Sequence, residues 1–137
     1  ATPPALFDLA SALFANGNRL ARTAMSFEAL LDEHESLPEE AAVCHFIEHA
    51  AKATHALAEA LQQRRAPAGL PDLRPLQHEL AQRLAVTRDH GKTELLARIS
   101  DRLTDNVNTL AHVIGRSPQL TMVDDRHRTG HVPGDAA

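Results

Sequence analysis

The segment 45–49, HFIEH, carries the residues best suited to chemistry, because its spacing H-x-x-E-H is that of one class of zinc metalloproteases. On a helix, His45 and His49 share a face and could hold Zn²⁺, with Glu48 as general base. A catalytic site needs a third protein ligand, and no downstream glutamate stands in a suitable context. Both histidines also lie off the apolar stripe of their helix. The sequence therefore favours solvated histidines that bind metal adventitiously at most, and predicts no catalytic residue and no cofactor.

Histidine phosphotransfer is a second chemistry open to a helical bundle. It requires an accessible imidazole, small neighbours and a cation that steadies the phosphoryl group. His55 has Lys52 three residues before it and Glu59 four residues after it, which is also an ordinary charged helix surface. The candidates by position are His45, His49, His55, His78 and His112.

Two asparagines interrupt apolar helical stripes and form a predicted structural polar seam. Asn106 lies within a stripe whose members recur at steps of three and four: Leu96, Ile99, Leu103, Asn106, Leu110 and Val113. Asn16 interrupts the stripe of the first helix in the same way, and a buried asparagine in such a seam fixes register and partner choice. The two amides are predicted to meet or to share a water inside the bundle. A helix face turned partly to solvent explains them equally well.

Composition favours helices and one domain. The chain has 137 residues, 43% of them hydrophobic and mostly Ala and Leu, and only 3% aromatic. The net charge of −4 with both signs interspersed gives no basic stripe of the kind that nucleic-acid binding requires. Cys44 is alone, which excludes an intrachain disulfide. No apolar run approaches the roughly 20 residues of a membrane span.

Helix signals predict an all-α, up-down-up-down antiparallel four-helix bundle over 1–115, followed by an irregular polar tail over 116–137. The helices are expected at about 4–32, 37–63, 72–88 and 93–114. Ser36 and Asp72 are predicted N-caps, and Pro118 is predicted to end the last helix. Gly17 is expected at a close backbone contact. The core stripe of the second helix is predicted as Val43, Ile47, Ala50, Thr54, Leu57 and Leu61.

Three segments resemble the cytoplasmic region of bacterial fusaric-acid-resistance and aromatic-acid-exporter proteins (FUSC-like). They are Leu13–Ala24, of the form LFANxxRLARA; Leu70–Gln77, of the form LPxLRxxQ; and Arg98–Ile114, of the form RIxDxxNTLAxLL. The resemblance covers most of residues 5–115, and its motifs are diffuse and rich in Ala and Leu. It does not account for HFIEH or for the histidines of the tail.

The resemblance implies that the chain is one domain of an inner-membrane transporter for the efflux of aromatic acids. The domain would be non-enzymatic, would lie at the cytoplasmic face, and would act in scaffolding, association or gating. Its partners would be the transmembrane part of its own full-length protein and other copies of itself, with no nucleic acid and no direct membrane insertion. The alternatives are a stand-alone helical interaction or phosphotransfer module, and a zinc hydrolase using HFIEH.

Overall fold

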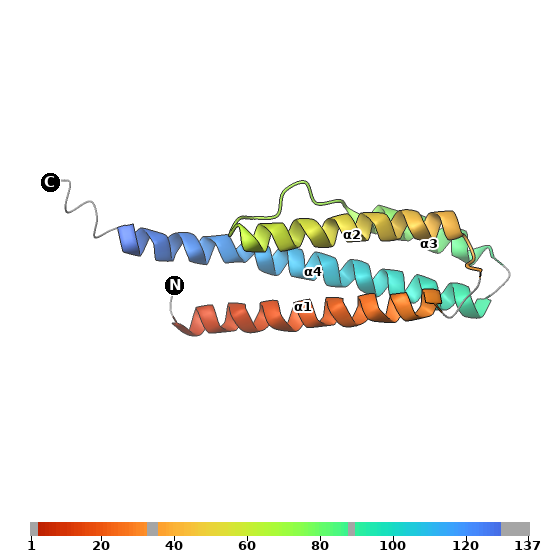
Figure 1. The fold of residues 1–137 in the computed structure, drawn as a ribbon, viewed down its shortest axis with the longest axis horizontal. Coiled ribbons are helices and arrows are strands. Elements are labelled where there is room, and N and C mark those ends of the chain that lie inside the picture. The colour runs from red at the N-terminus through yellow and green to blue at the C-terminus, as the bar shows by residue number, and fades with distance from the viewer. Residues whose placement is uncertain (1–2, 33–35, 88–89, 130–137) are drawn as a thin grey trace.

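Four α-helices make up the structure, a computed structural model that describes residues 3–32, 36–87 and 90–129. They are α1 (Pro3–Asp32), α2 (Glu40–Gln62), α3 (Leu73–Ala85) and α4 (His90–Thr129). Successive helices run in opposite directions, so the predicted all-α, up-down-up-down arrangement is confirmed (Figure 1). No strand occurs within the described ranges.

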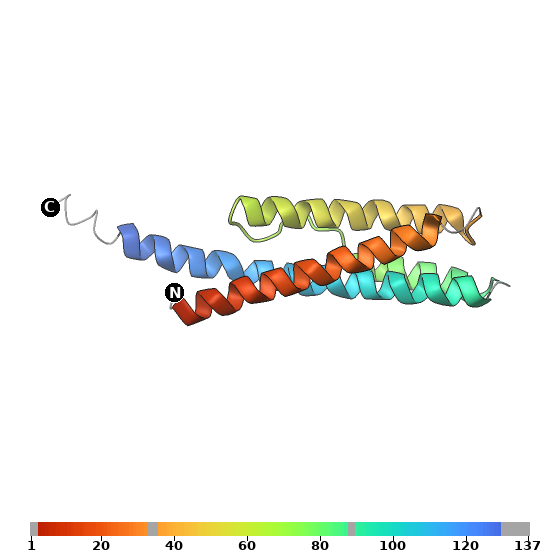
Figure 2. The ribbon, with the colours of Figure 1, turned by 60° about the horizontal axis from the view of Figure 1, so that its bottom comes forward.

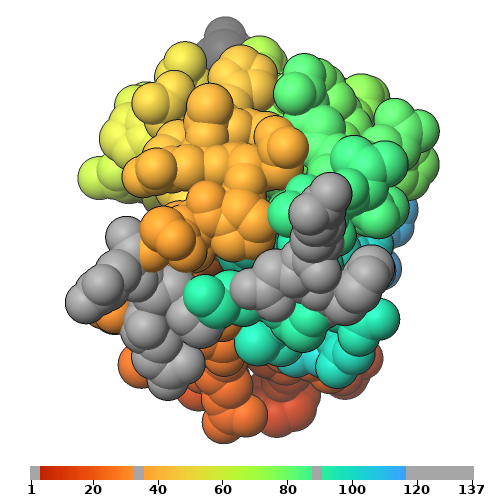
Figure 3. Space-filling model, turned by 90° about the vertical axis from the view of Figure 1, so that its right-hand side faces the viewer, coloured from red at the N-terminus to blue at the C-terminus, as the bar shows by residue number. Residues whose placement is uncertain are grey.

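The helix α4 lies at the centre of the bundle and packs against each of the other three, while α2 also packs against α3. The first turns of α2 and the last turns of α3 lie side by side at one end of the molecule (Figure 3). The helix α1 crosses α4 obliquely (Figure 2). It meets α2 near its own C-terminal end, where the ring centroids of Phe27 and Phe46 lie 6.4 Å apart. The ring of helices is therefore closed at this end, which we call the closed end, and open along α1 and α2.

The core follows the predicted stripe of α4. Its apolar members are all buried: Leu96, Ile99, Leu103, Leu110 and Val113. Ser100 and Thr104 are also buried, and their hydroxyls donate to backbone carbonyls one turn back, at Ala97 and Ser100. Because these hydroxyls are satisfied locally, a polar residue costs little on the buried face of α4.

The predicted core stripe of α2 is confirmed at Val43, Ala50 and Leu57 and is wrong at Thr54 and Leu61. Thr54 is exposed and Leu61 is 44% exposed, whereas Phe46 is 1% exposed and Ala53 and Ala60 are fully buried. The buried face consists of Val43, Phe46, Ala50, Ala53, Leu57 and Ala60. Alanines lie on every side of this helix, so spacing alone does not fix the buried face, and the volume of Phe46 decides it.

Helix ends differ from prediction in two places. Glu39, in the left-handed region at φ 50°, precedes α2 without a side-chain cap, and Ser36 is an exposed bend rather than an N-cap. The helix predicted to end at Ile114 continues through Pro118 to Thr129, because a proline removes one backbone bond without always ending a helix. The cap at Asp72 is confirmed: its side chain accepts from Arg74 N–H at 3.2 Å.

The four helices differ in length, and this leaves part of α1 uncovered. The helix α3 has 13 residues, whereas α1 has 30 and α4 has 40. The first half of α1 lies beyond the reach of α3, and its apolar side chains are exposed: Leu6 by 42%, Phe7 by 71% and Phe14 by 78%. Among the described helices, none combines the length and the apolar character that a membrane span requires.

Candidate functional site

The histidine pair of HFIEH shares one face of α2, as its spacing predicts. The ring centroids of His45 and His49 lie 4.4 Å apart. His49 Nδ1 lies 3.0 Å from the carbonyl oxygen of His45, and since a carbonyl oxygen only accepts, this nitrogen is the donor. Glu48 is exposed. The described residues contain no group of three or more metal-ligating side chains, so they supply no third ligand.

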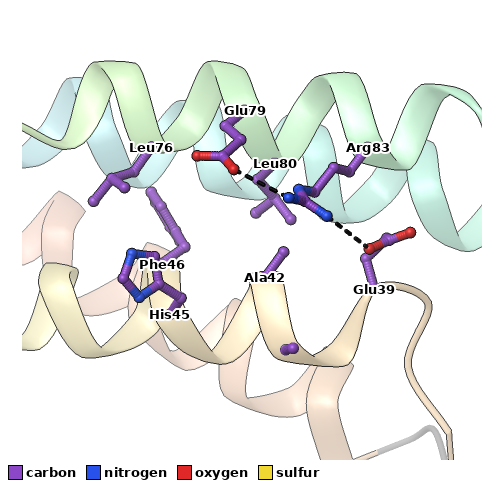
Figure 4. A pocket seen from close by; sticks show the side chains of 9 residues that line it. Glu39, Ala42, His45, Phe46, Leu76, Glu79, Leu80 and Arg83 are labelled. Carbon is purple, nitrogen blue, oxygen red and sulfur yellow. Dashed lines mark hydrogen bonds and ion pairs between the residues drawn. The ribbon is translucent and has the colours of Figure 1, made fainter.

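A cavity of about 340 Å³ between α2 and α3 has His45 on its α2 side (Figure 4). Its carboxylates belong to Glu39 and Glu79, and both face Arg83, whose guanidinium nitrogens lie 3.9 Å and 3.3 Å from them. A metal ion here would meet a guanidinium that already holds these carboxylates, so the cavity does not complete the predicted zinc site.

The other histidine candidates lie apart from one another. His55, His78 and His112 are exposed, on α2, α3 and α4 respectively. Nε2 of His55 lies 3.4 Å from a carboxylate oxygen of Glu59. A carboxylate at this distance repels an incoming phosphoryl group, so the geometry around His55 adds nothing to the phosphotransfer prediction.

The predicted contact between the two seam asparagines is wrong. Asn106 Oδ1 accepts a hydrogen bond of 2.6 Å from Oγ1 of Thr23, which is 6% exposed. Asn16 lies seven residues before Thr23, about 10 Å along the helix, and donates to the carbonyl of Ala12. The two amides therefore lie in different layers of the α1–α4 interface. Thr23 belongs to the same stripe as Asn16. It pairs with Asn106 in place of Asn16, because its short hydroxyl side chain fits a buried layer.

A polar contact between α3 and α4 was not predicted. Arg74 donates to Asp101 and Asp105, two acidic residues one turn apart on α4, and to Oε1 of Gln77 at 3.1 Å. Gln77 is 4% exposed, and its Nε2 lies 3.5 Å from Oγ of Ser100. Asp101 and Asp105 have basic neighbours on their own helix, yet they bind a residue of another helix. We call these five residues the α3–α4 polar contact.

A groove of about 780 Å³ lies between α1 and α2, and we call it the α1–α2 groove. Its lining is mostly alanine and larger aliphatic residues: Gly17, Leu20, Ala21, Ala24, Phe27, Glu28, Leu31, Ile47, Ala50, Ala51, Thr54, His55, Ala58 and Leu103. The predicted close packing at Gly17 is wrong, since a Cβ placed there meets nothing within 4 Å. Gly17 instead lies in open space on the α1 wall.

Sequence reasoning missed this groove, although a signal was present. The helix α1 carries a second apolar flank beside the stripe that packs on α4: Phe7, Ala10, Phe14, Ala21, Ala24 and Leu31. A wide apolar face indicates two neighbours. Among the described helices, α4 alone packs along the length of α1, and the second flank borders the groove or is exposed.

No protein-family model, curated protein or solved structure matches this chain. The resemblance to the exporter family therefore stays a prediction.

Proposed function

We propose that this chain is a non-enzymatic helical domain that acts by protein association, with the α1–α2 groove as its contact surface. The observation that carries the proposal is the apolar lining of this groove, which lies between two antiparallel helices that meet only toward one end. Beside the groove the same helix leaves large apolar side chains exposed, Phe14 by 78%, and an apolar hollow with such neighbours marks a contact site for another protein.

The walls of the groove suit a helix. The small side chains of Ala21, Ala24, Ala51 and Ala58 line both helices, so that the backbone of a third helix can approach them closely. An amphipathic helix that lays its apolar side chains into such a groove is a recurring mode of recognition. Because Glu28 and His55 are the only charged or titratable residues of the lining, the partner's contact face is expected to be apolar.

The setting that we propose is the cytoplasmic side of an inner-membrane exporter of aromatic acids. The segment Leu13–Ala24, which carries part of the resemblance to that family, supplies most of the α1 wall of the groove. A contact surface at this position would serve the scaffolding, association or gating role. The groove would then join this domain to another part of the exporter or to another copy.

A matched pair of charge substitutions tests the association role. Ala24 and Ala29 are both exposed on α1, but only Ala24 lines the groove. In the full-length gene product, Ala24→Glu is expected to lower the export rate of a labelled aromatic carboxylate at least about threefold, whereas Ala29→Glu leaves it unchanged. Unchanged export in both variants would refute a role for the groove. Unchanged export after deletion of the gene would refute the exporter setting instead.

A further inference from the structure

We infer that the occupant of the α1–α2 groove is α1 of a second copy, which runs antiparallel to the first in a two-fold symmetric dimer. This inference rests on the proposed function and names its partner. The starting observation is that two large exposed side chains, Phe7 and Phe14, lie on the same face of α1 as the small residues of the groove wall.

The outer stripe of α1 advances at alternating steps of three and four, which keeps its members on one side of the helix. Its first half contains the two phenylalanines, 71% and 78% exposed, and its second half contains only small residues before Glu28. The stripe over this range is Phe7, Ala10, Phe14, Gly17, Ala21 and Ala24. One helix face therefore carries two large side chains and, farther along, three small positions.

An antiparallel pairing centred between Phe14 and Gly17 brings these two halves together. Phe14 of each copy then lies opposite Gly17 of the other, and Phe7 lies opposite Ala24, so every large side chain meets a small one. Ala10 lies opposite Ala21. A parallel pairing would instead place phenylalanine against phenylalanine and leave the small residues facing each other. Only the antiparallel register fills the groove.

The space around the small positions suits the two rings. A Cβ at Gly17 meets nothing within 4 Å, so the ring of Phe14 has room to lie against the bare backbone. The α2 wall, with Ile47, Ala51 and Ala58, borders the same space. The groove volume of about 780 Å³ accommodates both rings of one incoming α1.

The first test is the mass of the intact chain. Sedimentation equilibrium from about 10 μM to about 1 mM is expected to show a monomer–dimer equilibrium. Gly17→Leu is expected to raise the dimer Kd at least about tenfold, because leucine occupies the space meant for Phe14. It should not harm the fold, since leucine favours helix more than glycine does and Gly17 lies in open space. Val86→Ser, at an 84% exposed residue after α3, is the control and should leave Kd unchanged.

A size swap distinguishes direct pairing from a general loss of apolar surface. Phe14→Ala alone is also expected to raise Kd at least about tenfold. The double variant Phe14→Ala/Gly17→Leu places leucine opposite alanine and should recover most of the affinity of the wild type. Additive losses in the double variant would overturn the proposed register.

Disulfide trapping tests the orientation. In a Cys44→Ser background, chains with Phe7→Cys mixed with chains with Ala24→Cys are expected to form a mixed disulfide, because these residues face each other. Chains with Phe7→Cys alone should stay unlinked, since the two cysteines would lie about 25 Å apart. Linking of Phe7→Cys to itself would show a parallel pair and overturn the proposal. A chain that stays monomeric at about 1 mM also overturns it, yet leaves the groove open to a different protein partner.

Discussion

Between α3 and α4, Arg74 reaches two carboxylates of the facing helix, and the buried Gln77 lies within hydrogen-bond distance of Ser100. Between α1 and α2, by contrast, both walls are mostly alanine, and beyond Phe27 and Phe46 the helices leave a groove. The α3–α4 polar contact fixes two helices within one molecule through specific hydrogen bonds. The α1–α2 groove has apolar surface and space that none of the residues the structure describes fills. The interface between α3 and α4 is therefore complete within one molecule, whereas we assign the α1–α2 groove to a partner.

The largest expected loss of stability comes from replacing a phenylalanine of the core, and a phenylalanine exposed on α1 provides the contrast. Phe46 is 1% exposed at the closed end, so Phe46→Ala should lower the free energy of unfolding by about 3–5 kcal/mol. Phe14 is 78% exposed, so Phe14→Ala should change it by less than about 0.5 kcal/mol in the monomer. Urea unfolding followed by circular dichroism at low micromolar concentration measures both. Similar losses for the two variants would mean that Phe14 belongs to the intramolecular core.

The hydrogen bond between Thr23 and Asn106 should come next in size. Thr23→Val leaves the amide oxygen of Asn106 without its donor, and about 1–2 kcal/mol of stability should be lost. The double variant Thr23→Val/Asn106→Leu should lose less than the sum of the single losses, by about 1 kcal/mol. Ser26→Ala, at an exposed hydroxyl on the same helix, is the control and should have little effect. Strictly additive losses would show that this bond does not join α1 to α4.

The α3–α4 polar contact should contribute about 1 kcal/mol, because Arg74 is 29% exposed while Asp101 and Asp105 are more than half exposed. Arg74→Met is expected to lose this amount, and the difference from the wild type should shrink in about 1 M salt. Arg102→Met, at an exposed arginine of α4, is the matched control. Equal unfolding midpoints for the two variants would refute a stabilising role for the contact between the helices.

The smallest effect is expected at the end of α2, which forms one wall of the groove. Arg64 has φ 53° in a motif where Arg65 N–H donates to Ala60 O at 3.0 Å, a position that usually holds glycine. Arg64→Gly should raise the free energy of unfolding by about 0.5–1 kcal/mol without changing the dimer Kd. Arg64→Ala removes the side chain but keeps the strain, so it should bring no such gain. An equal gain in both variants would assign the effect to lost charge.

The sequence predicted the arrangement of the helices more fully than their contacts. The stripe of α4 was readable because Leu96, Ile99 and Leu103 are large and lie among polar residues. The stripe of α2 was not, because alanine is apolar on every side and its burial depends on neighbours. The same ambiguity hid the groove, whose alanines line a surface instead of a core.

Partners across helices were beyond the reach of spacing. Asp101 and Asp105 have helix neighbours of opposite charge, so local pairs were the natural prediction, and the approach of Arg74 depends on how α3 packs. Likewise, Asn106 pairs with Thr23 rather than Asn16 because the crossing of α1 over α4 sets the layer. Sequence gives the buried face of a helix where large apolar residues mark it, as on α4, whereas the offset between helices comes from packing.

Occupation of the α1–α2 groove by a second α1 can be observed in a dilution series of ¹H–¹⁵N correlation spectra. Between about 1 mM and about 20 μM, shifts are expected to change along the first half of α1 and at the groove residues, including Gly17, Ala24 and Ala51, while those of Arg74 and Gln77 stay constant. Spectra that do not change on dilution, or that change mainly at the α3–α4 polar contact, would rule out a dimer formed through this groove.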